Sequence, residues 1–163
     1  MEISKVFPSV NPIFANERHG GSDQEGTIML RLIYISTARA PVAPAELDGI
    51  LAVSRRNNAR AGVTGLLVAG GRRFLQALEG PDDAVAETLA RIGRDPRHFA
   101  VVTLRRDAIA ARAFPDWTMG YQRGGAIGAA GSLTAIVAAL TSEIADPAVR
   151  AYFTGFAEVN AAA

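Results

Sequence analysis

The sequence predicts an α+β domain with a ferredoxin-like sheet. Four segments, at 30–36, 63–69, 73–80 and 99–104, have the apolar patterns and lengths of strands. Two segments of helical spacing separate them, and each begins at a proline, Pro44 and Pro81, which suits the first turn of a helix. The resulting order β-α-β-β-α-β is the split βαβ arrangement, in which both helices cover one face of the sheet.

Length and composition exclude several functional classes. The chain has 163 residues and a formal net charge of +1, with no basic run longer than a pair, which argues against nucleic acid binding. No apolar stretch approaches the ~18 residues of a membrane span, and no secretory signal is visible, so we expect a cytoplasmic protein. Cysteine is absent and only two histidines occur, which excludes disulfides, thiolate sites and a multi-histidine metal site.

Three parts are predicted along the chain. Residues 1–28 are rich in Ser, Asn, Gly and Pro and are predicted to form an irregular extension. Residues 29–123 hold the domain, and residues 124–163 hold a glycine-rich link and a pair of helices. Both faces of the first strand are apolar, with Leu32 and Tyr34 on one and Ile33 and Ile35 on the other, as in a central strand covered on both sides.

The first predicted helix ends at Gly62, and its inner stripe begins apolar and ends polar. The Gly70-Gly71 pair predicts a two-residue hairpin into the third strand, where Gln76 lies between Phe74 and Leu78 on one face. A buried carboxamide without partners costs roughly 1–3 kcal/mol. Taken alone, Gln76 would therefore fit a solvated face better than the core. The polar residues of the helical stripe are Ser54, Asn57 and Asn58.

The second predicted helix carries Asp82 and Asp83 in its first turn, where the helix dipole favours acidic residues. A turn at 95–98 leads into the fourth strand. A short fifth strand is predicted at 117–121, with Trp117 and Met119 facing the same side because strand side chains alternate.

The second face of this sheet requires a cover, since its residues are also apolar. The segments 133–144 and 146–156 show helical apolar stripes. We expect these two helices to pack on the open face. The alternative is that they form a dimer interface.

Five polar residues converge on the face beneath the first two helices. Each has an ordinary explanation: a tyrosine with its hydroxyl at an edge, asparagines that end a helix, or a serine bonded to its own helix. Together they line one slot whose polar groups require partners, and a flat heterocycle with carbonyls, ring nitrogens and an N–H would satisfy them. These residues are Tyr34, Ser54, Asn57, Asn58 and Gln76.

The chain resembles the BLUF domains, the blue-light sensors that use flavin, over about residues 30–122. Six segments in the family's order carry the resemblance. They are Leu32-Ile-Tyr34-Ile-Ser36, Ser54-Arg-Arg-Asn57-Asn58, Gly62-Val-Thr-Gly65-Leu-Leu67, Phe74-Leu-Gln76-Ala-Leu-Glu79-Gly80, Arg91-Ile-Gly-Arg-Asp95-Pro-Arg97-His98 and Trp117-Thr-Met119-Gly120.

The resemblance implies a non-covalently bound flavin between the two helices, FAD in most of the family, with FMN as the alternative. It places Asn58 on the pyrimidine side of the ring and Asn57 against the ring. It places Asp95, Arg97 and His98 near the ring and the ribityl-phosphate side. A capping histidine in a surface turn and a local Asp95–Arg97 ion pair are the competing interpretations.

The resemblance also implies a photochemical role for Tyr34 and Gln76. Tyr34 would donate an electron and a proton, and Gln76 would then rearrange its hydrogen bonds. Trp117 or Met119 would lie beside Gln76, unless either is simply a core residue. The chain is then a sensor and not an enzyme. Its output is an interaction with itself, as a homo-oligomer, or with an unidentified downstream signalling protein.

Two alternatives stay open at this point. One is a ferredoxin-like ligand-binding or interaction module that does not respond to light. The intact Tyr34 and Gln76 pair argues against it. The other is an acylphosphatase-like enzyme, which would use Arg39 after the first strand to hold an anion.

Overall fold

The computed structural model describes residues 28–123 and 132–160. Within them, the sheet has the strand order β4-β1-β3-β2-β5, and all neighbours are antiparallel except the parallel pair β2 and β5. The ferredoxin-like fold predicted from the sequence is confirmed. The elements are β1 (Met29–Ala38), α1 (Pro44–Ala61), β2 (Thr64–Gly70), β3 (Arg73–Pro81), α2 (Asp82–Gly93), β4 (His98–Ile109), β5 (Gly120–Arg123), α3 (Leu133–Thr141) and α4 (Pro147–Asn160).

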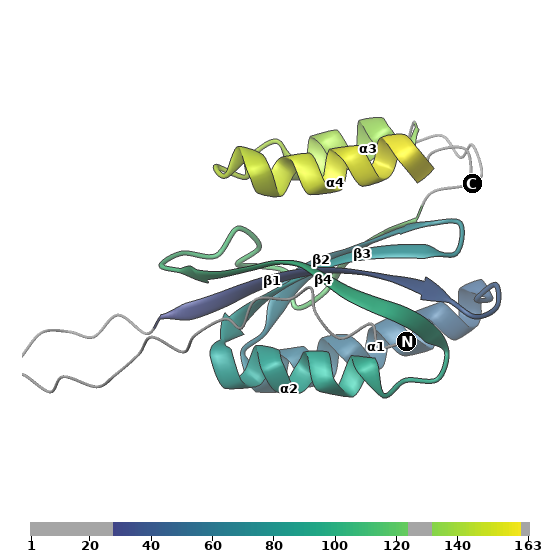
Figure 1. Ribbon diagram of the computed structural model, residues 1–163, viewed down its shortest axis with the longest axis horizontal. Helices are drawn as coiled ribbons and strands as arrows, with labels where there is room; N and C mark the ends of the chain where they lie inside the picture. The colour runs from purple at the N-terminus through teal and green to yellow at the C-terminus, as the bar shows by residue number, and fades with distance from the viewer. Residues whose placement is uncertain (1–27, 124–131, 161–163) are drawn as a thin grey trace, which may run out of the picture.

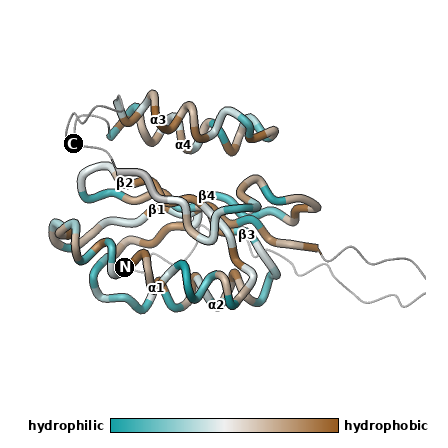
Figure 2. The backbone as a smooth tube through the Cα atoms, turned by 180° about the vertical axis from the view of Figure 1, so that it is seen from behind, coloured by the Kyte–Doolittle hydropathy of each residue, from teal (hydrophilic) through white to brown (hydrophobic). Residues whose placement is uncertain are grey.

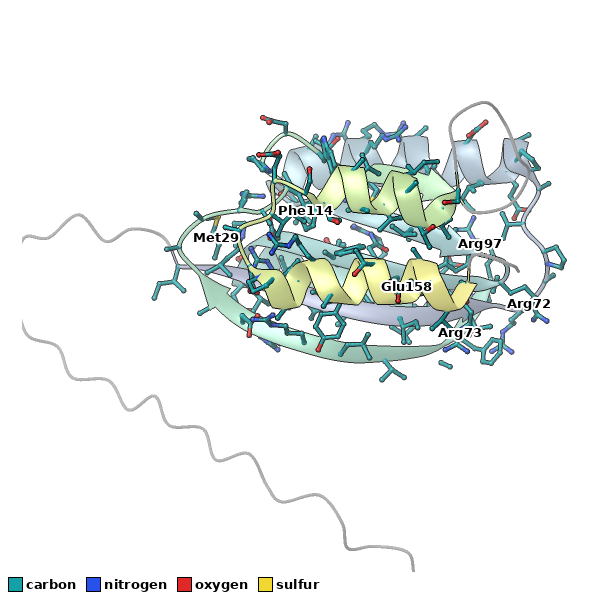
Figure 3. The ribbon with its side chains drawn as sticks, turned by 90° about the horizontal axis from the view of Figure 1, so that it is seen from above. Met29, Arg72, Arg73, Arg97, Phe114 and Glu158 are labelled. Carbon is teal, nitrogen blue, oxygen red and sulfur yellow. The ribbon has the colours of Figure 1, made fainter. Side chains whose placement is uncertain are left out.

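The molecule has three layers (Figure 1), with α1 and α2 on one face of the sheet and α3 and α4 on the other. The predicted cover of the second face is therefore confirmed. Figure 3, seen from the α3 and α4 side, shows these two helices lying next to each other over the strands. In the part of the chain that is described, no helix is both long and apolar enough to cross a membrane.

Strand alternation divides the interior between the two faces. Tyr34 of β1 is opposite Gln76 of β3, and both side chains point towards α1 and α2. Their neighbours Ile33 and Ala77 point towards α3 and α4, where they join a fully buried apolar cluster with Phe153. Figure 2 colours much of the central strands as hydrophobic, whereas hydrophilic residues recur along α1 and α2.

The hairpin between β2 and β3 differs from the predicted one by a single residue. Its two-residue turn is Gly71-Arg72, with Gly71 at a φ of 56°, and Gly70 is instead the last paired residue of β2. A Cβ at Gly70 would lie 2.4 Å from the Cβ of Asn160, so this glycine is needed for the close approach of the end of α4.

Two strand boundaries were predicted wrongly. β4 continues past Leu104 to Ile109, because an edge strand tolerates the charged run of Arg105, Arg106 and Asp107. β5 begins at Gly120 and not at residue 117. The extension at 1–27 and the link at 124–131 lie outside the described residues, and the division of the chain into three parts stays a prediction.

Candidate functional site

A hydrogen-bonded trio lies at the centre of the α1 and α2 face. The Tyr34 hydroxyl donates to Oε1 of Gln76, and the Gln76 amide nitrogen donates to Sδ of Met119 over 3.2 Å. Tyr34 and Gln76 are 3% and 7% exposed, so Gln76 does not lie on a solvated face. Its carboxamide is satisfied at both ends by polar or polarisable neighbours within the core.

Burial raises the pKa of the Tyr34 phenol well above its usual range. The hydroxyl therefore stays protonated throughout the neutral range and donates its proton to Gln76. This bond fixes the orientation of the carboxamide, since the oxygen must face the phenol and the amide nitrogen must face the sulfur.

The trio opens into a cavity of about 510 Å³ between the sheet and the helices α1 and α2. This volume is within the range of small-molecule and cofactor sites. Apolar side chains such as Ile50, Leu51 and Leu67 form part of its wall. The photoactive candidate Tyr34 lines it, and so do all the predicted binding residues, namely Ser54, Asn57, Asn58, Gln76, Asp95, Arg97 and His98.

Helix α1 contributes its polar end to this cavity, as its stripe predicted. Ser54, Asn57 and Asn58 lie one helical turn or less apart, so they share the inner side of the helix. Asn58 is 2% exposed, and its amide nitrogen donates to the Thr118 carbonyl over 2.8 Å. This is the one hydrogen bond of the Asn58 side chain to a described residue, and it leaves a second N–H and the carbonyl oxygen for a ligand.

The turn at 95–98 forms one rim of the cavity. Nε of Arg97 lies 2.9 and 3.0 Å from the two oxygens of Asp95, and this hydrogen bonding lowers the pKa of Asp95 to about 2. Nε2 of His98 lies 2.9 Å from the Ile92 carbonyl oxygen and therefore carries the proton that it donates. The Asp95–Arg97 ion pair and the hydrogen bond from His98 to the end of α2 are both present. All three residues also line the cavity.

Trp117 and Met119 do not face the same side. Met119 packs beside Tyr34 in the cluster beneath α1 and α2, whereas Trp117 packs into the opposite cluster, with its ring stacked on Phe114 at 5.9 Å. The prediction was wrong because residues 117–119 precede β5 and follow a bent path, so strand alternation does not apply to them. Met119 is the neighbour of Gln76.

Several cavity residues were not predicted. Ser36, Thr88 and Arg91 line it, and the Arg91 side chain contacts Thr88 at 3.4 Å. Arg91 begins one of the six segments that carry the family resemblance, but only the packing of α2 on the sheet places it at the cavity. Arg39, the residue on which the acylphosphatase-like alternative depends, instead donates to the Pro96 carbonyl and lies over the ring of Phe99.

The donor set fits a flavin. The cavity combines apolar walls with the carboxamides of Asn58 and Gln76, each of which presents a donor and an acceptor side by side. A planar ring with carbonyl oxygens, ring nitrogens and an N–H matches such groups. Arginines at the rim, Arg91 and Arg97, match the charge of a phosphate-bearing tail.

Comparison with known proteins agrees with this geometry. A family model described as "BLUF: Sensors of blue-light using FAD" matches residues 29–120. The photoactivated adenylate cyclase subunit beta of Euglena gracilis is 38% identical over 94 residues, which are 57% of this chain and 11% of the cyclase. The blue light- and temperature-regulated antirepressor BluF of Escherichia coli is 34% identical over 87 residues, 53% of this chain and 22% of the antirepressor. The chain thus spans between about a tenth and a fifth of these curated relatives.

Solved structures show the same fold. The dark-state structure of BlrB, a BLUF protein, superposes with a TM-score of 0.63 at 30% identity, covering 82% of this chain and 98% of BlrB. A structure of Klebsiella pneumoniae BlrP1 with FMN and cyclic diGMP has a TM-score of 0.63 at 28% identity and covers 82% of this chain and 35% of BlrP1.

Proposed function

The chain belongs to the BLUF family of blue-light sensors that use FAD, and on that premise we propose a residue-level mechanism for its light response. The family match covers a sensor domain, which in the cyclase relatives is a small part of a longer enzyme. The observation that carries the proposal is the chain of hydrogen bonds from Tyr34 through Gln76 to Met119.

When bound, the flavin supplies the absorption of blue light and an electron acceptor, and its visible spectrum reports the hydrogen bonds made to its ring. Tyr34 would release an electron to that acceptor, and its hydroxyl proton would pass to Oε1 of Gln76. Both then return to Tyr34. The carboxamide would be left rotated or tautomerised, and in the rotated form its amide nitrogen would lie where the oxygen was.

A carboxamide suits this role because its two ends have nearly the same shape but opposite hydrogen-bonding character. Rotation of Gln76 would exchange the acceptor that faces Tyr34 for a donor, and the donor that faces Met119 for an acceptor. The network then has two arrangements with almost the same packed volume, which is the property a switch requires.

We assign roles around the ring to the remaining cavity residues. Asn58 binds the pyrimidine side and Asn57 packs against the ring. Asp95, Arg97 and His98 line the ribityl-phosphate side. Their positions at the cavity support these roles. FAD is the family's cofactor. FMN is the alternative cofactor that the same cavity residues would bind in its place.

The output is proposed to pass to α3 and α4. Met119 contacts Gln76, while Trp117, two residues earlier, stacks on Phe114, whose ring in turn meets Phe153 of α4 edge-on at 5.8 Å. A shift of the 117–119 segment would therefore reach α4 through aromatic contacts. From there the signal would act on a second copy of the chain or on a downstream protein. We expect this chain itself to be cytoplasmic.

Visible spectra before and after blue light test the mechanism. The wild-type protein should bind flavin and show a small, reversible red shift. Tyr34→Phe and Gln76→Leu should retain flavin and lose the shift. Tyr152→Phe is the matched control, because Tyr152 lies on α4, and it should photocycle normally. A normal photocycle in either cavity variant would refute the assigned roles, and a colourless protein would favour the light-insensitive binding module.

A further inference from the structure

The segment Trp117–Met119 is held by three hydrogen bonds to its three consecutive carbonyl groups. The Gly65 backbone N–H donates to the Trp117 carbonyl over 2.8 Å, and Asn58 donates to that of Thr118 over 2.8 Å. Nε of Arg55 donates to the Met119 carbonyl over 3.0 Å. Two of these donors come from α1, so the helix that lines the cavity also holds the segment that leads into β5.

The position of this segment controls both faces of the sheet. The Met119 side chain lies beside Gln76, whereas the Trp117 ring packs on the α3 and α4 side. There it also covers Gly120, where a Cβ would lie 2.8 Å from the ring. A main-chain shift of this segment would therefore move a cavity contact and an aromatic contact of the output route together.

Arg55 differs from the other two donors in its accessibility. The Asn58 side chain is buried and the Gly65 donor belongs to a strand, whereas Arg55 is exposed. Among the described residues, Arg55 forms no ion pair with a carboxylate, and its bond to Met119 is its single hydrogen bond through the side chain. Arg55 thus reaches from an exposed position to the carbonyl of a buried residue, since Met119 is 3% exposed.

We propose that Arg55 is a positioning residue for the photocycle. It holds the Met119 carbonyl, and thereby the Met119 sulfur beside Gln76, in the dark arrangement. The inference rests on the proposed function. After light, a rotated Gln76 no longer donates to the Met119 sulfur. Arg55 then keeps Met119 close to Gln76, so that the dark hydrogen bond between them can form again.

Dark recovery of the red shift measures this role. Arg55→Ala should slow recovery about fivefold, which corresponds to the roughly 1 kcal/mol of one net hydrogen bond. Arg55→Lys should restore most of the wild-type rate, because an ammonium group can also donate to a carbonyl. Arg56→Ala is the matched control. Arg56 is exposed and makes no hydrogen bond to a described residue, so this variant should recover at the wild-type rate.

A second measurement does not depend on photochemistry. Trp117 is the only tryptophan in the chain, so its fluorescence reports the segment directly. In the full chain, with and without flavin, Arg55→Ala should raise the acrylamide quenching constant about twofold, a shift of the kind expected when one restraining hydrogen bond is lost.

Two results would overturn the proposal. One is an Arg55→Ala variant with wild-type recovery and wild-type quenching. The other is an Arg56→Ala variant that slows recovery as much as Arg55→Ala does. If the wild-type protein shows no red shift, the proposed function fails, and the quenching of Trp117 still decides whether Arg55 holds the segment.

Discussion

The two faces of the sheet are made by alternate residues of the same strands, yet their interiors differ. Towards α3 and α4, Ile33, Ala77 and Phe153 are fully buried in a close-packed apolar cluster. Towards α1 and α2, Tyr34 and Gln76 open into a cavity of about 510 Å³ with polar groups along its wall. A packed interior resists change, whereas a hydrogen-bonded cavity has alternative arrangements. The sheet thus combines a rigid support with a face that can respond to a ligand.

The largest loss of stability should follow from removing a large buried side chain from the α3 and α4 face. Phe153→Ala removes a fully buried ring that meets Phe114 edge-on, and it should lower the free energy of unfolding by about 3–5 kcal/mol. Because Phe153 does not line the cavity, the flavin affinity of the folded protein should change less than about threefold, well under 1 kcal/mol. Urea unfolding and flavin titration measure the two quantities.

Tyr152→Phe is the control on the same helix and should stay within about 0.5 kcal/mol of wild type. A Phe153→Ala variant that is folded but unable to bind flavin would contradict the separation of the two faces.

A buried ion pair interrupts the apolar face. The Glu79 carboxylate is fully buried and accepts from Nε of Arg31 at 2.6 Å and from the backbone N–H groups of Ala113 and Phe114. Glu79→Gln should destabilise by about 3 kcal/mol, because the buried charge of Arg31 loses its main partner. Thermal or urea unfolding checks this value.

Asp146→Asn provides the comparison for Glu79→Gln. Asp146 caps α4 by accepting from the N–H groups of Ala148 and Val149 and lies 3.7 Å from Arg31. Asparagine can still accept the capping bonds, so the expected loss is under about 1 kcal/mol. Equal losses in the two variants would show that burial of the pair is not what stabilises it.

The sequence was sufficient to predict the cavity face. Strand alternation predicted which side chains share a face, and Tyr34 and Gln76 do lie on the same face, opposite each other in the β1–β3 register. The polar end of the α1 stripe then indicates which helix residues meet them. Local pattern predicted which face each of these residues occupies, because that depends on short-range periodicity, whereas the β1–β3 pairing that brings Tyr34 to Gln76 is a tertiary contact.

The sequence was not sufficient for the segment before β5. The four residues of β5 are a strand because they pair in parallel with β2, which lies about 50 residues earlier in the chain. No periodicity within 117–121 reports that pairing. The opposite directions of Trp117 and Met119 come from hydrogen bonds to Gly65, Asn58 and Arg55, and these are tertiary contacts. Residue roles around the ring also stay predictions until flavin binding is measured.

A smaller effect is expected where α1 joins the cavity face. Asn58→Ala removes the bond to the Thr118 carbonyl and should destabilise the flavin-free protein by about 1 kcal/mol. It should also weaken flavin binding about tenfold, equivalent to about 1.4 kcal/mol. Asn57→Ala is the control for stability, because no hydrogen bond joins its side chain to a described residue. Unchanged flavin affinity in Asn58→Ala would remove Asn58 from the binding site.

The smallest effect concerns the cavity rim, where stability should depend on pH. The hydrogen bonds from Arg97 lower the pKa of Asp95 to about 2, from an ordinary value of 3.8. Since the folded state binds this proton less readily than the unfolded state, the contribution of the pair is complete above about pH 4. It is lost as the pH falls from there towards 2. The difference in urea midpoint between wild type and Asp95→Asn should be constant from pH 7 to about 4 and then shrink. A difference that instead changes between pH 7 and 5 would mean that another group, and not Asp95, titrates at the rim.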